Sequence, residues 1–371
     1  MYQTMLSRYR HYPAPFRVAV LFASLLNTLK SFKICSAIAF DNSDASLQNQ
    51  NDPFYVPSFR LSDLRSSRAP PHGFSDALGS AGIVAITGME GAPSLSELRS
   101  DALGGLCRCL SDRPDALQGV DGFDSILLAG SKTDRQTVAT ATAPGGIPLP
   151  LPSDDIADAC GVVVSEAMEG LRDVVSEVSS AFVDALDALL LARPGAEDLP
   201  PILESARGTE YPTVSGIVED SRHLEHFHLY SKIENSLENG GGVDHHRRQR
   251  LNGIDLDVHA DAGLFLAFVP ALPCGEDLST SPDGIDESFL VSMPGKGRIS
   301  LQRAVFPPGS VAVMLGMGAE SWLDLGSQQN NDGLRVNLRA TRHAVGMRFG
   351  ERRAWYGMSK SSQGFCLCLL C

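Results

Sequence analysis

Residues 257–268 carry the pattern that decides the fold of this chain, and they read Asp-Val-His-Ala-Asp-Ala-Gly-Leu-Phe-Leu-Ala-Phe. His259 and Asp261 stand two residues apart, so on a strand their side chains share one face. The apolar run from Gly263 to Val269 predicts a buried strand directly after them. One imidazole and one carboxylate side by side can occupy adjacent positions on a metal ion, and a third ligand must then come from elsewhere in the chain.

The sequence after Asp261 holds a single further histidine, His343. Two histidines and one carboxylate leave three coordination positions open, as a non-haem Fe(II) oxygenase needs. Arg352 and Arg353 follow, and a guanidinium binds a carboxylate through two parallel hydrogen bonds. Because side chains alternate along a strand, Arg353 shares the face of Trp355, and we favour it over Arg352 as the carboxylate ligand.

The half of the chain that contains these residues has the texture of a β domain. From about residue 206, short apolar runs alternate with Gly- and Pro-containing turns, and this pattern is typical of a sandwich, jelly roll or barrel. The predicted strands are His226–Tyr230, Gly263–Val269, Phe289–Met293, Ile299–Phe306, Val311–Leu315, Leu338–Ala344 and Ala354–Met358.

The preceding sequence is different in character. Residues 79–205 are expected to be mainly helical after one buried strand at 82–88. Ser94-Leu-Ser-Glu97 forms a capping box that predicts a helix to about residue 110, and Ser153 opens a long amphipathic helix that extends to about residue 193. Residues 41–78, rich in Ser, Asp, Asn and Pro, are expected to form a disordered linker. The predicted domains are therefore 1–40, 41–78, 79–205, 206–360 and a Cys-rich tail, 361–371.

Both ends of the chain carry sequences typical of processing signals. In residues 1–40, arginines precede a twelve-residue apolar run and an Ala-x-Ala-like site, as in a secretory signal or a two-part plastid presequence. An unstructured extension of a cytoplasmic protein is the alternative. The last four residues, Cys368-Leu-Leu-Cys371, fit a prenylation box, and an apolar terminus is the alternative. No stretch reaches the 18 or so apolar residues of a membrane span.

Composition narrows the function further. The 371 residues include 31 Lys and Arg against 44 Asp and Glu, a net charge of −13. An acidic chain repels the phosphate backbone, so we expect no nucleic-acid partner and favour a small-molecule one. The eight cysteines lack the paired C-x-x-C spacing of a zinc site, and Cys107 and Cys109 are expected to be unpaired core or surface residues.

The motifs of residues 250–358 resemble those of the Fe(II)- and 2-oxoglutarate-dependent dioxygenases, on the branch that includes isopenicillin N synthase. The segment 259–268 is similar to the family's H-x-D-x-G strand, 307–318 to its strand and turn before the distal histidine, and 339–345 to its S-x-x-H-R-V. The resemblance implies a double-stranded β-helix, an α+β jelly-roll core with an N-terminal mainly helical region. It also implies an enzyme that uses O2 and 2-oxoglutarate to hydroxylate a small molecule, releasing succinate and CO2.

The same resemblance assigns roles to individual residues. His259, Asp261 and His343 would bind Fe(II), and Arg353 would hold the distal carboxylate of 2-oxoglutarate. Apart from the resemblance, His226, His228 and Tyr230 alternate onto one face of their strand, and Tyr230 is expected to be a hydroxyl partner for 2-oxoglutarate. His223, His226 and His228 form a second candidate metal cluster or a polar strand at the barrel mouth.

One departure keeps other interpretations open. The family's R-x-S motif is Arg353-Ala-Trp355 here, so a hydroxyl that helps hold the co-substrate is missing. The alternatives are a β-helix binding or scaffold module without turnover, and a cupin-like metalloenzyme that does not use 2-oxoglutarate.

Overall fold

The architecture was analysed in a computed structural model that describes twelve stretches of the chain. These are residues 53–66, 69–128, 133–141, 151–191, 203–204, 209–221, 223–232, 254–275, 288–294, 299–323, 337–347 and 350–360. All of them belong to one compact unit, residues 46–363. The expected targeting segment and the Cys-rich tail lie outside the described residues.

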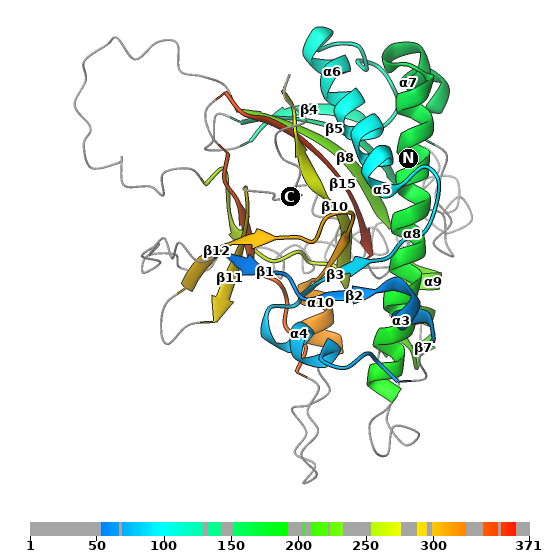
Figure 1. Ribbon diagram of the computed structural model, residues 1–371, viewed down its shortest axis with the longest axis vertical. Coiled ribbons are helices and arrows are strands. Elements are labelled where there is room, and N and C mark those ends of the chain that lie inside the picture. The colour runs from blue at the N-terminus through cyan, green and yellow to red at the C-terminus, as the bar shows by residue number, and fades with distance from the viewer. Residues whose placement is uncertain are drawn as a thin grey trace, which may run out of the picture. The chain divides into compact units, whose positions relative to one another are not determined.

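The described elements are strands and short helices, with one long helix, α8, along one side (Figure 1). The helices are α3 (Leu61–Ser66), α4 (Phe74–Ser80), α5 (Leu95–Arg99), the π-helical turn Ser100–Gly104, α6 (Gly105–Asp112), α7 (Ser153–Cys160), α8 (Val162–Leu191), α9 (Val214–Asp220) and α10 (Met317–Trp322). The strands before residue 221 are β1 (Phe54–Tyr55), β2 (Ser58–Arg60), β3 (Ile83–Thr87), β4 (Phe123–Leu127), β5 (Thr133–Ala141), β6 (Leu203–Glu204) and β7 (Glu210–Tyr211). The later strands are β8 (Leu224–Lys232), β9 (Leu256–His259), β10 (Phe265–Pro273), β11 (Phe289–Pro294), β12 (Ile299–Val305), β13 (Val311–Leu315), β14 (His343–Val345) and β15 (Arg352–Lys360).

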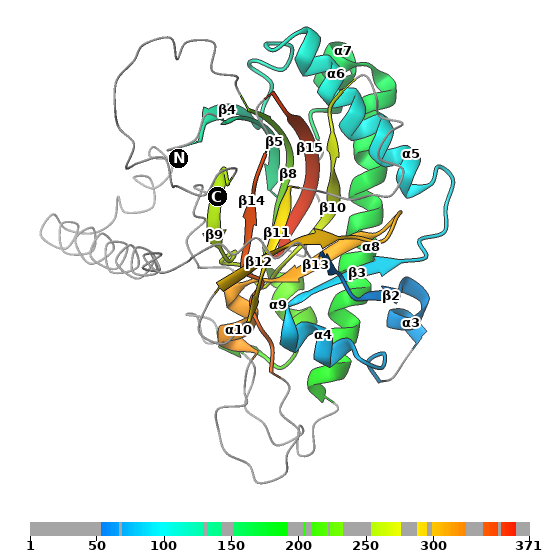
Figure 2. The ribbon, with the colours of Figure 1, turned by 60° about the vertical axis from the view of Figure 1, so that its left-hand side comes forward.

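The eight strands β8–β15 form a double-stranded β-helix. One sheet contains the order β13-β10-β15-β8 and the other the order β12-β11-β14-β9, with every neighbouring pair antiparallel. Apart from β11 and β12, which pair with each other in one sheet, successive strands alternate between the two sheets, which is the connectivity of a jelly roll. Figure 2 shows the two sheets face to face, with β9 and β14 opposite β8 and β15. The fold expected from the sequence is confirmed.

Strands from the N-terminal region extend the larger sheet on both sides. β3 and β2 continue it beyond β13, and β5 and β4 continue it beyond β8. Residues 79–205 thus supply three strands of the larger sheet as well as helices. The expected linker over 41–78 also differs from the structure, because β1, β2, α3 and α4 fall within it and the side chains of Leu61, Leu64 and Phe74 are buried.

Helix α8 covers the outer face of the larger sheet. Its apolar stripe packs on the strand residues that point away from the second sheet, among them Phe265, Val313 and Tyr356. The opposite alternation of the same strands, with Leu266 and Phe268, packs toward the second sheet. The period of two in a strand therefore divides the sheet into a face that anchors the helix and a face that lines the barrel.

Two features of the helical layer differ from the sequence expectation. The long helix predicted from Ser153 is broken into α7 and α8 at Gly161, whose φ of 100° lies in the region open mainly to glycine. Cys107 and Cys109 are paired, with Cys274 and Cys160 respectively. The expectation of unpaired residues is wrong because the partners lie 167 and 51 residues away, a separation at which the sequence shows no spacing pattern.

Among the helices that the structure describes, none has both the length and the apolar character that crossing a bilayer requires.

The Phe182 side chain is predicted to be a principal anchor of α8. It is fully buried and contacts the rings of Phe74 and Phe265 at centroid distances of 5.7 and 5.1 Å. Replacing a buried Phe by Ala removes its burial and leaves a cavity, so Phe182→Ala should lower the free energy of unfolding by about 3–5 kcal/mol in urea denaturation. Val163→Ala in the same helix, at a side chain 62% exposed, is the control and should change it by less than about 0.5 kcal/mol. Equal effects of the two changes would contradict this packing.

Candidate metal centre

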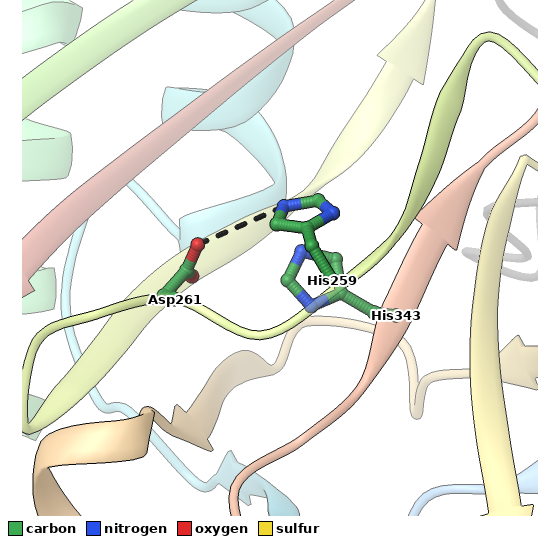
Figure 3. Close-up of side chains that lie close together, drawn as sticks. All are labelled: His259, Asp261 and His343. Atoms are coloured by element: carbon green, nitrogen blue, oxygen red, sulfur yellow. Dashed lines mark ion pairs between the residues drawn. The ribbon is translucent and has the colours of Figure 1, made fainter. Parts of the chain in front are cut away.

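The three sequence-predicted ligands converge between the two sheets. His259 ends β9, Asp261 lies in the turn after it, and His343 opens β14, the neighbouring strand (Figure 3). His343 pairs directly with His259 in the sheet register, and their rings lie 4.3 Å apart. One ligand atom from each of the three residues lies within 4.8 Å of the others, and within the described stretches no other His, Cys, Asp and Glu side chains form such a group.

Hydrogen bonds to the backbone orient both imidazoles. Nδ1 of His259 donates to the carbonyl oxygen of Asp257 at 2.8 Å, and Nδ1 of His343 donates to that of Thr341 at 3.3 Å. A carbonyl only accepts, so each Nδ1 carries the proton and each Nε2 keeps its lone pair for a metal. Nε2 of His259 already lies 3.8 Å from a carboxylate oxygen of Asp261. The donor set fits a divalent metal of the iron type.

The turn that follows β13, at Gly316 and Met317, holds the segment that carries Asp261. The backbone N–H of Met317 donates to the carbonyl of Asp261 at 2.7 Å, and that of Gly316 donates to Leu264. A Cβ at Gly316 would lie 2.2 Å from the carbonyl oxygen of Gly263, so only glycine allows this approach. The turn after β13 therefore fixes the carboxylate ligand relative to the strand that follows it.

Burial keeps the inner ligand neutral. His343 is 5% exposed and stacks on Phe289, and its pKa falls to about 4 because burial disfavours the charged ring, with repulsion from His259 adding to this and Asp261 opposing it. The side chains of His259 and Asp261 are 24% and 21% exposed. The centre thus has one ligand in the protein interior and two at its solvent side.

Asp255, just before β9, ties the two sheets together next to this centre. Its carboxylate accepts hydrogen bonds from Thr133 of β5 at 2.8 Å, from Lys232 of β8 at 3.0 Å and from the backbone N–H of Met347 at 2.7 Å. Its own N–H donates to Val345 of β14 at 2.7 Å. These bonds fix β9 and β14, which carry the histidines, against the larger sheet.

Arg353 and Tyr230 lie opposite each other on that larger sheet. Arg353 is 3% exposed while its neighbour Arg352 is exposed, as the strand alternation predicts. Tyr230 is its partner in the β15–β8 register, with the guanidinium carbon 5.9 Å from the centre of the phenol ring. A buried guanidinium beside a phenol fits a carboxylate ligand.

Trp355 lies two residues after Arg353, on the same face of β15. Its ring packs against His228 at 4.9 Å and against Phe268 at 6.3 Å, and Gly357 leaves room for it, since a Cβ there would lie 2.3 Å from the ring. The indole ring therefore makes this part of the barrel wall apolar.

The three histidines at 223, 226 and 228 do not point the same way, and His223 lies just before β8. His226, His228 and Tyr230 line the barrel, since His226 stacks on His228 at 4.9 Å and His228 lies 5.7 Å from the ring of Tyr230. His223 instead bonds the carbonyl of Val218, and burial, with the charge of Lys360 adding to it, lowers its pKa to about 3. The sequence expectation of a polar strand facing the barrel fits this arrangement, whereas the three histidines do not converge as a second metal site.

The sequence analysis predicted neither β5 nor the buried arginine that it carries, Arg135. The segment Thr133–Ala141 has polar residues in both alternations, so the hydrophobic pattern that marks a half-buried strand is absent. The available signal was Thr133-x-Arg-x-Thr137, a polar alternation with β-branched residues.

Comparisons with known proteins find similar solved structures, all at low sequence identity. No protein-family model matches the chain, and no curated protein matches it. The dioxygenase for auxin oxidation from rice is 15% identical, with 83% of this chain and 86% of that one covered and a TM-score of 0.47. JOX2 in complex with 2OG, Fe and JA is 12% identical over 85% and 78% of the two chains, at a TM-score of 0.48. A Neurospora crassa protein in complex with alpha-KG and 5-formyluracil is 11% identical over 83% and 85%, at a TM-score of 0.47.

Removing one ligand is predicted to abolish tight metal binding. His343→Ala takes away the imidazole from the buried side of the centre, and the two remaining ligands hold a metal weakly, so the affinity for Fe(II) should fall at least about 100-fold in an anaerobic calorimetric titration. The exposed His72 provides the control, because His72→Ala removes an imidazole far along the chain and should leave the affinity unchanged. Unaltered binding by His343→Ala would place the metal elsewhere.

The metal-free protein is predicted to lose stability as the pH falls. The pKa of His343 is about 4 in the folded chain and about 6.5 in an unfolded one, so between these values the unfolded state binds more protons. The stabilisation is complete above pH 6.5 and declines toward pH 4. With EDTA present, His343→Asn should lessen the fall in unfolding free energy between pH 6.5 and 5 by about 1–2 kcal/mol. His72→Asn should not, and equal pH dependence in all three proteins would refute this role of burial.

Proposed function

We propose that the protein is a non-haem Fe(II)- and 2-oxoglutarate-dependent oxygenase that oxidises a small molecule. The observation that carries the proposal is the convergence of His259, Asp261 and His343 at a single point between the sheets of a double-stranded β-helix. Two imidazoles and one carboxylate leave three positions on one side of the metal for co-substrate and O2. Placement in the isopenicillin N synthase branch stays a prediction.

The proposed division of labour follows from the positions of the side chains. Nε2 of His259, Nε2 of His343 and the Asp261 carboxylate hold the iron, while the carbonyls of Asp257 and Thr341 fix the two rings in the tautomer that binds. Arg353 holds the distal carboxylate of 2-oxoglutarate, and the Tyr230 hydroxyl adds a hydrogen bond in place of the serine that Trp355 replaces. Bound iron and co-substrate would supply the oxidising power: 2-oxoglutarate would take up one oxygen atom of O2 and release CO2 to become succinate, and the other oxygen atom would enter the substrate.

The surroundings of the centre suit this chemistry. Phe289 packs on His343, and Phe268 and Trp355 form an apolar wall on the larger sheet. Such a wall excludes water from the reacting atoms and protects them from side reactions. Asp255 keeps the ligand strands at a fixed distance from the sheet that carries Arg353.

An anaerobic absorption titration tests the proposal. Adding Fe(II) and then 2-oxoglutarate to the full chain should give a visible charge-transfer band only when both are present, and His343→Ala should show none. Arg353→Gln should weaken 2-oxoglutarate binding at least about tenfold, because a charge-assisted, paired hydrogen bond is lost. Arg352→Gln, the exposed neighbour, is the matched control and should bind normally.

The other outcomes identify the alternatives. Iron binding without the band, and without an effect of Arg353→Gln, would indicate a cupin-like metalloenzyme that does not use 2-oxoglutarate. Absence of iron binding would leave a β-helix binding or scaffold module.

Tyr230→Phe examines the replacement of the missing serine. If the phenol hydroxyl holds the co-substrate carboxylate, its removal should raise the dissociation constant of 2-oxoglutarate by about 3- to 10-fold, the usual effect of one hydrogen bond. The measurement is the same titration, with iron affinity as the internal control. A dissociation constant equal to that of the unmodified protein would assign the hydroxyl another role.

A further inference from the structure

We propose that Arg135 binds a carboxylate of the primary substrate, so that the substrate is a small carboxylic acid with an apolar or aromatic body. The inference rests on the proposed function, since it assigns the second ligand of the same site. It goes beyond that function by naming the substrate class and the residue that selects it.

The neighbours of Arg135 on β5 show which way its side chain points. Thr133 bonds Asp255 at the second sheet, and the Thr137 hydroxyl bonds Nδ1 of His228 at 2.7 Å, so both lie on the barrel face of β5. Arg135 stands midway between them in the same alternation and is only 8% exposed. Gln136, in the opposite alternation, bonds the carbonyl of Pro114 outside the barrel. Arg135 therefore places a charged group inside the barrel wall.

Arg135 and Arg353 flank Tyr230 in one cross-strand row. Tyr230 is the register partner of Arg135 on one side and of Arg353 on the other. Two strand spacings separate the two arginine backbones by about 10 Å. A row with two buried guanidiniums suits two separate carboxylates, one on the co-substrate and one on the substrate.

Of the two arginines, Arg135 is the one whose charge acts on the histidines of β8. Burial lowers the pKa of His226 to about 4, and the positive charge of Arg135 adds to this effect. Burial also lowers the pKa of His228, and His226 and Arg135 add to that effect. Asp261 of the metal centre acts on the pKa of His226 in the opposite direction. His226 thus interacts electrostatically with both Arg135 and a residue of the candidate metal centre.

The atoms around Arg135 favour a singly charged, planar group. His226 and His228 are neutral at pH 7, so among these three side chains the positive charge is on the Arg135 guanidinium. Nδ1 of His226 is buried without a hydrogen-bond partner, and native structures rarely leave such an atom unpaired. The charged residues on the barrel face of β5, β8 and β15 are Arg135, Lys232 and Arg353, and the carboxylate of Asp255 bonds Thr133 and Lys232 at one end of this row. One guanidinium fork matches one carboxylate.

The rings beside Arg135 indicate the remainder of the substrate. His228 contacts Trp355 and Tyr230 along the barrel wall at centroid distances of 4.9 and 5.7 Å. Aromatic faces of this kind pack on planar or apolar carbon skeletons. Trp355 at the position of a serine therefore enlarges the apolar part of the substrate surface.

Matched pairs of acids and their primary amides test the proposal by binding alone. The probes are phenylacetate and phenylacetamide, 3-phenylpropionate and its amide, and hexanoate and hexanamide, titrated by tryptophan fluorescence. The full chain is used both alone and loaded with Mn(II) and 2-oxoglutarate. At least one acid should bind about tenfold or more tightly than its amide, and Arg135→Gln should remove that preference while the amide binds as before.

Two further variants separate the bidentate contact from general charge and from misfolding. Arg135→Lys keeps the charge without the planar fork and should recover only part of the acid preference. Arg108→Gln removes an exposed arginine of α6 and should change nothing. The charge-transfer band of Fe(II) and 2-oxoglutarate should persist in Arg135→Gln, which also shows that the variant is folded.

Three results would overturn the proposal. These are equal binding of acids and amides by the unmodified protein, an acid preference that survives Arg135→Gln, and loss of 2-oxoglutarate binding in Arg135→Gln, which would assign Arg135 to the co-substrate. An acid preference that depends on Arg135, in a protein without the charge-transfer band, would support the anion site and refute the proposed oxygenase instead.

Discussion

The carboxylate of Asp255 is the interaction on which the geometry of the site most depends. It accepts hydrogen bonds from two strands of the larger sheet and from the segment after β14, while its own backbone bonds β14 directly. A double-stranded β-helix needs such a link, because hydrogen bonds within a sheet do not fix the separation of two facing sheets. Lys232 compensates its buried charge at 3.0 Å, so the pair satisfies the requirement that a buried ion be both paired and hydrogen-bonded. The metal ligands on one sheet and the arginines on the other are thereby held at a constant separation.

The barrel wall shows how strand alternation serves two purposes at once. On β10, Phe265 packs toward α8 and Phe268 toward the opposite sheet, so a continuous apolar run supplies both cores. On β8 the outward residues Phe227 and Leu229 are apolar and pack in the same core as the helices, whereas the inward alternation of β5 and β8 carries polar groups such as Arg135 and His226. The polar inward residue His226 interacts with Asp261 of the metal centre, and the apolar inward residue Phe289 stacks on His343. The inward residues therefore place both polar and apolar groups around the metal ligands.

The sequence predicts the parts of this protein that have a strong local pattern. The strand at 311–315, the capping box at Ser94 and the H-x-D with its distal His343 each follow from periodicity or spacing, and the structure has them at these positions. β5 could not be found in this way because it carries polar residues in both alternations, and the disulfide of Cys107 depends on a partner just after β10 that only the folded chain brings near. Asp255 was missed for a related reason. Its importance arises from contacts between residues 92 and 122 positions apart, which no local pattern encodes.

A crystal structure of the full chain with Mn(II) in place of iron, together with 2-oxoglutarate, tests the central claim most directly. The account predicts metal density bound by His259, Asp261 and His343, with the distal carboxylate of 2-oxoglutarate on Arg353 and Tyr230. Metal held by other residues, or 2-oxoglutarate bound through Arg135 with Arg353 uninvolved, would contradict it.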